Sequence, residues 1–209
     1  QLAGKSLLTK ELASLCRTAE NEFVGLPCGI LDQGTSAFGK KDHLVHIDCN
    51  KEIFSNLPIP SDTEVWIFNT GIKHDLVDSL YSTRHQECVE ALQKGQEKYP
   101  TKKKLTDFTL DEIEVLNLPG NLKKRATHVS EEQARVMRFK EGLTSKMSAE
   151  ELGRLLAESH ESSSRNFENS CDELDFLAEN LNNHSAVLGA RLTGGGFGGA
   201  VMAWTRSSF

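Results

Sequence analysis

The stretch ARLTGGGFGGAVMAW, residues 190–204, places five glycines within six positions between two apolar segments. Glycine tolerates positive φ and lets another backbone or a phosphate group approach closely. Ordering five glycines is costly in conformational entropy, so the pattern predicts a loop that some other group approaches. Successive N–H groups in such a loop can also bind an anion. We therefore expect a strand over Val187–Thr193, a glycine loop over Gly194–Gly199 and a strand over Ala200–Trp204.

The glycine pattern differs from the common nucleotide-binding loops. A Walker loop requires Gly-Lys-Ser or Gly-Lys-Thr, and neither follows here. Gly194, Gly196 and Gly199 have the spacing of a dinucleotide fingerprint, but a strand is predicted where that fingerprint needs a helix. The alternative is a wide hairpin whose glycines only permit close packing of the strands.

Upstream of this loop the sequence predicts both helices and strands. Apolar residues recur every three or four positions over residues 8–23 and indicate a helix, which Gly25-Leu26-Pro27 ends. Residues 43–49 and 64–70 read as strands, and a helical pattern covers about residues 77–92. The prolines that follow residue 57 mark a break in the chain.

Three further helix starts are predicted from a hydroxyl residue followed three positions later by Glu or Gln, a pair that can satisfy two unpaired N–H groups. The pairs are Ser130 with Gln133, Ser148 with Glu151, and Ser170 with Glu173. The corresponding helices would cover about residues 131–146, 149–168 and 171–181. Because helices and strands do not alternate as strict βαβ units, the chain is predicted to be α+β.

Composition narrows the classes of partner. The 209 residues are 38% hydrophobic and 26% charged, as in soluble globular proteins. No apolar run approaches the roughly 20 residues of a membrane helix, so we expect no membrane partner. The net charge of −6 argues against nucleic acid, which is usually bound by a strongly basic surface.

The cysteines and histidines predict neither a disulfide framework nor a metal site. Five cysteines without a C-x-x-C pair are typical of reduced thiols in a cytoplasmic protein, each a small core residue. They are Cys16, Cys28, Cys49, Cys88 and Cys171. Only His43 and His46 lie close together, and strand residues at i and i+3 face opposite ways. Trp66 and Trp204, in predicted strands, are expected in the core.

The stretch GLPCGILDQGTSAFGKKDHLVHIDC, residues 25–49, together with the glycine loop, resembles the galactokinase branch of the GHMP small-molecule kinases. Residues 69–88, 125–136 and 156–177 are also similar and follow in the family's order; only about residues 95–122 match weakly. The resemblance implies the two-domain GHMP architecture. Residues 1–61 would be the end of the N-terminal domain, and residues 62–209 most of the ferredoxin-like C-terminal domain.

The activity implied by the resemblance is phosphorylation of D-galactose by ATP at the anomeric hydroxyl, with Mg²⁺, in a cytoplasmic monomer. The family's Arg-containing sugar motif and its phosphate loop, which carries the usual Mg²⁺ ligand, are not in these 209 residues. We therefore expect an internal piece of such a kinase, inactive alone and without metal ligands of its own. A kinase for N-acetylgalactosamine or arabinose, or a non-catalytic galactose- and ATP-binding sensor, is the alternative.

The same resemblance assigns roles to individual residues. Asp32 matches the catalytic Asp, which accepts the proton of the sugar hydroxyl or orients it. Gly29 matches a backbone contact to the sugar, and Tyr81 a residue that packs on it or hydrogen-bonds to it. The glycines expected beside the sugar and the phosphate chain are Gly194, Gly195, Gly196, Gly198 and Gly199. Without the resemblance, Asp32 would be a helix cap and Tyr81 a packed helix residue.

Overall fold

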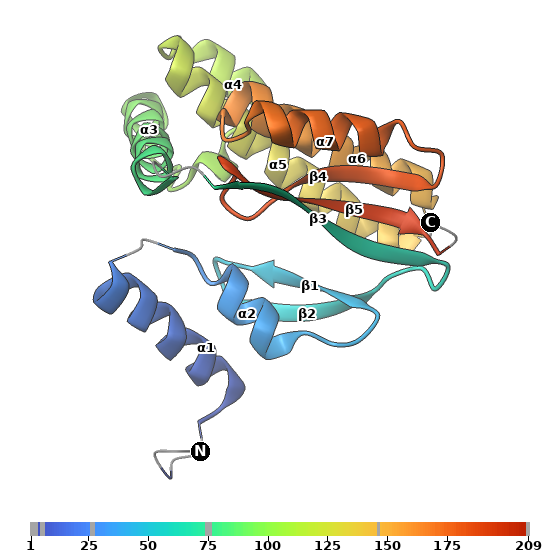
Figure 1. Cartoon of the computed structure of the whole chain (residues 1–209). Coiled ribbons are helices and arrows are strands. Elements are labelled where there is room, and N and C mark those ends of the chain that lie inside the picture. The colour runs from blue at the N-terminus through green and yellow to red at the C-terminus, as the bar shows by residue number, and fades with distance from the viewer. Residues whose placement is uncertain (1–3, 5–6, 26–27, 74–76, 146, 208–209) are drawn as a thin grey trace. The chain divides into compact units, whose positions relative to one another are not determined.

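The computed structural model describes the whole chain except residues 1–3, 5–6, 26–27, 74–76, 146 and 208–209 (Figure 1). The chain divides into two compact units, residues 1–61 and residues 62–209. Each unit contains both helices and antiparallel strands. The predicted α+β class is therefore confirmed, and each unit is described below by itself.

The first unit is a pair of helical segments and a β-hairpin. Its elements are α1 (Thr9–Thr18), the π-helical turn η1 (Ala19–Val24), α2 (Leu31–Phe38), β1 (His43–Asp48) and β2 (Ile53–Pro58). The two strands are antiparallel, with His43 opposite Pro58 and Asp48 opposite Ile53. The strand predicted over residues 43–49 is confirmed as β1. Strand β2 was not predicted, because Pro58, its last residue, reads as a break.

Helix α1 confirms the helical pattern, but its apolar residues do not form a core. Leu12 and Leu15 are 49% and 56% exposed, whereas Ala13 is buried. Phe23, in the π-helical turn, is 91% exposed. Periodicity correctly placed these residues on a helix, but periodicity does not say what covers the apolar face.

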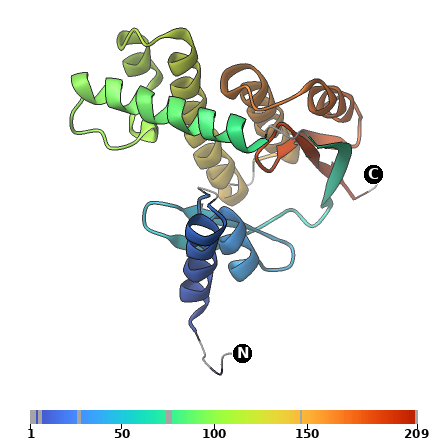
Figure 2. The same ribbon diagram turned by 60° about the vertical axis from the view of Figure 1, so that its left-hand side comes forward.

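The second unit combines a three-stranded sheet with a set of helices (Figures 1 and 2). In chain order its elements are β3 (Thr63–Lys73), α3 (Val77–Lys98), the 3-10 turn η2 (Leu105–Asp107), α4 (Leu110–Val115), α5 (Gly120–Ser145), α6 (Ala149–Ser162), the π-helical turn η3 (Ser163–Phe167), α7 (Asp172–Asn182), β4 (Val187–Thr193) and β5 (Gly198–Arg206). The strand order is β3-β5-β4, and both pairings are antiparallel. The strands predicted on either side of the glycines are thus neighbours, with β5 in the centre.

Helices α6 and α7 pack on β4 and β5. Leu174, Ala178 and Leu181 of α7 form one core cluster with apolar residues of both strands, and α6 forms another with Trp204. The backbones of α6 and β4 touch directly, because a Cβ at Gly153 would lie 1.9 Å from the carbonyl oxygen of Leu188. Apolar burial of this kind is the main stabilising contribution, and it fixes the strands that carry the glycines.

Two of the three predicted helix starts differ from the structure. Ser130 lies inside α5, and its hydroxyl donates to the carbonyl oxygen of Phe108 at 2.8 Å instead of capping a helix. Helix α7 begins at Asp172 after Cys171, and the Ser170 hydroxyl donates to Asp175. The Ser148 start is confirmed: its hydroxyl accepts the N–H of Glu151, as a capping box requires.

Some expectations of burial were also wrong. Trp204 is buried as predicted, at 3% exposed, but Trp66 on the outer strand β3 is 43% exposed. Cys16 and Cys49 are exposed, whereas the other three cysteines are partly buried, so none is a fully buried core residue. Residue type alone does not predict the burial of a tryptophan, because Trp66 lies on an outer strand of the sheet and Trp204 on the central one.

Candidate functional site

Asp32 lies in the first turn of α2 and is exposed. The alternative that Asp32 caps a helix is right that a helix begins here. It is wrong about the cap, because Ile30 occupies the cap position and no side chain caps the helix. Two residues on, Gly34 is buried against the hairpin: a Cβ there would lie 2.4 Å from the Phe54 ring. A separation of two residues rotates the side-chain direction by about 200° around a helix, so Asp32 points away from the hairpin. The positive end of the helix dipole also favours a carboxylate at this position.

Contacts at both ends hold α2 in place. At its end, the rings of Phe38 and Phe54 stack with centroids 4.2 Å apart. In its first turn, Gln33 Nε2 donates to Glu20 Oε2 at 2.8 Å. Gly29, just before the helix, is exposed, and no atom lies within 4 Å of where its Cβ would be. Asp32 is therefore an accessible carboxylate on an anchored helix, with open space at Gly29.

In the second unit, the glycines form a tight turn with left-handed backbone. The turn covers residues 194–197, two residues shorter than the predicted loop, because β5 already begins at Gly198. Gly194 and Gly196 have φ of 77° and 85°, and Gly198 and Gly199 have 116° and 85°. Such angles are costly for residues with a Cβ, which explains these four glycines without any ligand but does not explain Gly195.

The group that approaches the turn most closely is another segment of the same chain. A Cβ at Gly196 would lie 2.0 Å from the carbonyl oxygen of Asn169. That oxygen accepts the N–H of Phe197 at 2.7 Å, and Asn169 Nδ2 donates to the carbonyl oxygen of Gly195 at 3.1 Å. The Thr70 hydroxyl donates to the carbonyl oxygen of Gly199 at 2.7 Å. Asn169 thus holds the turn, and Thr70 holds the start of the strand that follows it.

Tyr81 of α3 lies beside the glycine turn. Its Cδ2 atom is 3.8 Å from the position of a Cβ at Gly195, and the side chain is half-buried. Figure 2 shows the N-terminal end of α3 reaching the sheet. The structure therefore brings together two of the predicted site elements, Tyr81 and the glycines. The other two, Gly29 and Asp32, lie together in the first unit.

An ionic cluster that joins α3, α5 and the residue after η3 was not predicted from the sequence. Arg125 is 1% exposed, and its guanidinium contacts Glu87 Oε2 at 2.6 Å and Glu168 Oε2 at 2.7 Å. Lys124 and Arg125 together lower the pKa of Glu168 to about 2, chiefly through their hydrogen bonds to its carboxylate. Arg84 also contacts Glu87. Local sequence does not reveal this cluster, because Arg125 lies 38 positions from Glu87 and 43 positions from Glu168.

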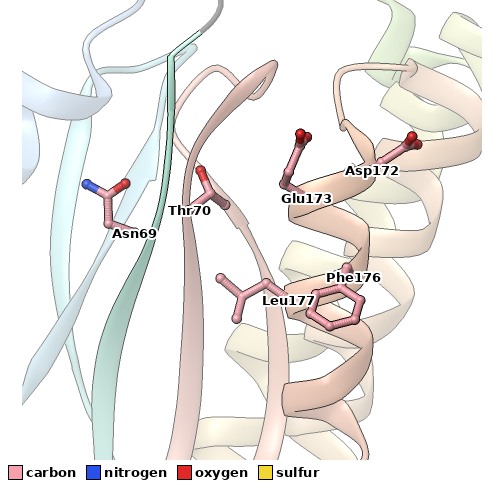
Figure 3. Close-up of a pocket in the computed structure, with 6 residues that line it drawn as sticks. All are labelled: Asn69, Thr70, Asp172, Glu173, Phe176 and Leu177. Atoms are coloured by element: carbon pink, nitrogen blue, oxygen red, sulfur yellow. The ribbon is translucent and has the colours of Figure 1, made fainter.

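A pocket of about 440 Å³ lies between the end of β3 and the start of α7 (Figure 3). It is lined by Asn69, Thr70, Asp172, Glu173, Phe176 and Leu177. Tyr81 and the glycines do not line it. Among the described residues no three His, Cys, Asp or Glu side chains are grouped to hold a metal ion. No helix in the described part of the chain is long and apolar enough to cross a membrane.

Comparison with known proteins gives matches for part of the second unit and for nearly the whole chain. Residues 140–208 match the family described as "GHMP kinases C terminal". These residues form a GHMP kinase C-terminal region. The chain as a whole is 42% identical over 197 residues to the galactokinase of Thermotoga petrophila, and 39% identical over 196 residues to that of Thermococcus kodakarensis. The predicted resemblance is confirmed.

The GHMP fold is also supported by a solved structure. The crystal structure of Lactococcus lactis galactokinase complexed with galactose matches with a TM-score of 0.92 at 31% identity, over 100% of this chain. The alignments cover 94% and 92% of this chain for the two curated relatives named above. They cover only 54% and 53% of those relatives, so the chain spans about half the length of the galactokinases it matches.

Proposed function

We propose that this protein is a galactokinase, which transfers a phosphoryl group from ATP to the anomeric hydroxyl of D-galactose. The observation that carries the proposal is the identity of about 40% with galactokinases across nearly the whole chain. The fold match to a galactose-bound galactokinase supports the same substrate. Because the chain spans about half of these relatives, the proposal concerns the activity of the whole protein.

Asp32 is assigned as the group that accepts or orients the proton of the attacking sugar hydroxyl. Phosphoryl transfer depends chiefly on positioning and on charge stabilisation, so an accessible carboxylate on a fixed helix suits this role. Tyr81 and the glycine turn are assigned to the sugar and the phosphate chain. Their proximity in the second unit supports a shared role, and Gly29 is assigned a backbone contact to the sugar.

ATP and Mg²⁺ are part of this proposal, as are the cytoplasmic location and the monomeric state. When bound, Mg²⁺ would neutralise charge on the ATP phosphates. The described residues do not fit a metal site of their own, since no group of three suitable side chains is present among them. No step is therefore assigned to the metal. The free cysteines agree with a reducing compartment.

The proposal is tested by measuring sugar-dependent ADP release from the whole protein, with galactose, N-acetylgalactosamine and arabinose as separate substrates. Galactose is expected to be the best substrate, and Asp32→Asn to lower kcat by about 10²–10⁴-fold with galactose binding retained. Asp42→Asn is the matched control, because Asp42 is exposed in the same unit with φ of 59°, a conformation that Asn tolerates. Galactose binding without turnover in the unmodified protein would favour the sensor.

A further inference from the structure

Helix α3 carries Tyr81 and, three positions later, a second residue that connects it to the glycine turn. Arg84 Nε and Nη2 donate to the carbonyl oxygen of Glu168 at 3.3 and 3.1 Å. Its third nitrogen, Nη1, donates to Glu87 Oε2 at 3.1 Å. The Arg84 guanidinium thus binds a backbone carbonyl group from a distant part of the chain. Arg84 lies about one helical turn from Tyr81.

The residue after Glu168 is the one that holds the glycine turn. Asn169 is 8% exposed, and its amide and its carbonyl oxygen bond to Gly195 and Phe197 respectively. Tyr81 also lies close to Gly195, with its Cδ2 atom 3.8 Å from the position of a Cβ there. The two-residue segment Glu168–Asn169 therefore joins the helix that carries Tyr81 to the turn that Tyr81 faces.

The Glu168–Asn169 segment is itself fixed. Glu168 has φ of 55° and ψ of 45°, a left-handed conformation that is uncommon for residues other than glycine, asparagine and aspartate. Its carboxylate lies between Lys124 Nζ at 2.6 Å and Arg125 Nη2 at 2.7 Å. Because Arg125 is buried, this carboxylate has a stationary partner. Contacts on both sides of the segment leave it little freedom to shift.

We propose that Arg84 and Asn169 are positioning residues of the sugar site. Arg84 fixes Tyr81 relative to the Glu168 carbonyl group, and Asn169 fixes the glycine turn relative to the same segment. The role in catalysis rests on the proposed function, whereas the mechanical link does not. A misplacement of about 1 Å can cost an enzyme about 100-fold in rate, so the link matters even though neither side chain reacts.

Hydrogen exchange of the whole protein tests the mechanical link without any assay of activity. Asn169→Ala removes the hydrogen bond from the side-chain amide of Asn169 to the carbonyl oxygen of Gly195. We expect the N–H groups of residues 194–197 to exchange at least tenfold faster in this variant. Asn180→Ala is the control, since Asn180 is exposed and its side-chain amide donates a hydrogen bond within α7, to the carbonyl oxygen of Phe176. Unchanged exchange in Asn169→Ala would overturn the proposal.

Kinetics with galactose test the positioning role. Lys keeps the charge of Arg84 but cannot make the two-nitrogen contact to a carbonyl group, so Arg84→Lys is expected to raise the KM for galactose about tenfold. Arg165→Lys is the control, because Arg165 is exposed and pairs, among the residues that the structure describes, with Glu161. A lower melting temperature with unchanged KM and kcat in Arg84→Lys would reduce Arg84 to a structural residue. If the unmodified protein phosphorylates no galactose, the proposed function fails, and hydrogen exchange still decides the link.

Discussion

Substitution of Gly196 by Ala tests whether the close approach of Asn169 is what the glycine turn requires. Two glycines of the turn offer a matched comparison, since Gly194 and Gly196 have similar φ of 77° and 85°. Their surroundings differ. A Cβ at Gly194 meets no atom within 4 Å, whereas a Cβ at Gly196 would lie 2.0 Å from the carbonyl oxygen of Asn169. The backbone strain is therefore shared, and the steric conflict is not.

The expected magnitudes follow from these two terms. A left-handed alanine costs about 1–2 kcal/mol, which is the whole effect expected for Gly194→Ala. At Gly196 the turn must also move away from Asn169 by about 1 Å, which breaks the 2.7 Å bond from the Phe197 N–H. A buried donor left without its partner costs about 1–3 kcal/mol more. We therefore expect Gly196→Ala to lower the free energy of unfolding by about 2–5 kcal/mol, which is about 2 kcal/mol more than Gly194→Ala.

Urea denaturation followed by tryptophan fluorescence measures this difference, because Trp66 and Trp204 lie on neighbouring strands of the sheet that carries the turn. For a protein of about this size, a further 2 kcal/mol corresponds to a melting temperature about 4–8 °C lower than that of Gly194→Ala. Equal destabilisation by the two substitutions would refute the reasoning. It would mean that the left-handed backbone alone, and not the contact with Asn169, explains Gly196.

Two further predictions concern buried charge. Arg125→Ala should lower the free energy of unfolding in urea by about 1.5–3 kcal/mol for each of the two charge-assisted hydrogen bonds that it removes, with Arg84 still beside Glu87 and Lys124 still beside Glu168. Arg165→Ala at an exposed pair should match the unmodified protein. Burial lowers the pKa of His128 from 6.5 to about 4, so the unfolded chain takes up a proton first as the pH falls. Stability should therefore drop by up to about 3 kcal/mol between pH 6.5 and pH 4, and an equal drop in His128→Asn would contradict this origin.

The parts of the fold that were predictable from sequence depend on local signals. The strands around the glycines were placed correctly, because β-rich runs and glycine both act over a few residues. The predicted helix start at Ser130 was wrong because it also depends on a local signal. A hydroxyl residue three positions before Gln looks like a cap in any context, but here α5 continues through it and the hydroxyl bonds to Phe108. Only the tertiary structure distinguishes the two cases.

The residues of the site also fall into those that the sequence predicts and those that it does not. Asp32, Tyr81 and the glycines carried enough local sequence to be recognised by resemblance. The residues that hold them in place did not, since Arg84 and Glu168 are separated by 84 positions. Asn169 has no distinguishing pattern, and its importance is visible only from its contacts with Gly195 and Phe197. Residues that position a site often lack a sequence pattern, because any side chain with a suitable donor can make the hydrogen bond if the fold places it within reach.

The glycine string therefore combines two requirements that look identical in sequence. Gly196 is needed because Asn169 occupies the space of a side chain, and this requirement is internal to the protein. Gly194 and Gly199 have equally unusual φ, but open space lies beside each of them. The original inference that some group must approach the glycines is met by the protein itself at Gly196. At Gly194 and Gly199 the left-handed backbone is by itself enough to require glycine, whereas Gly196 is also required by the contact with Asn169.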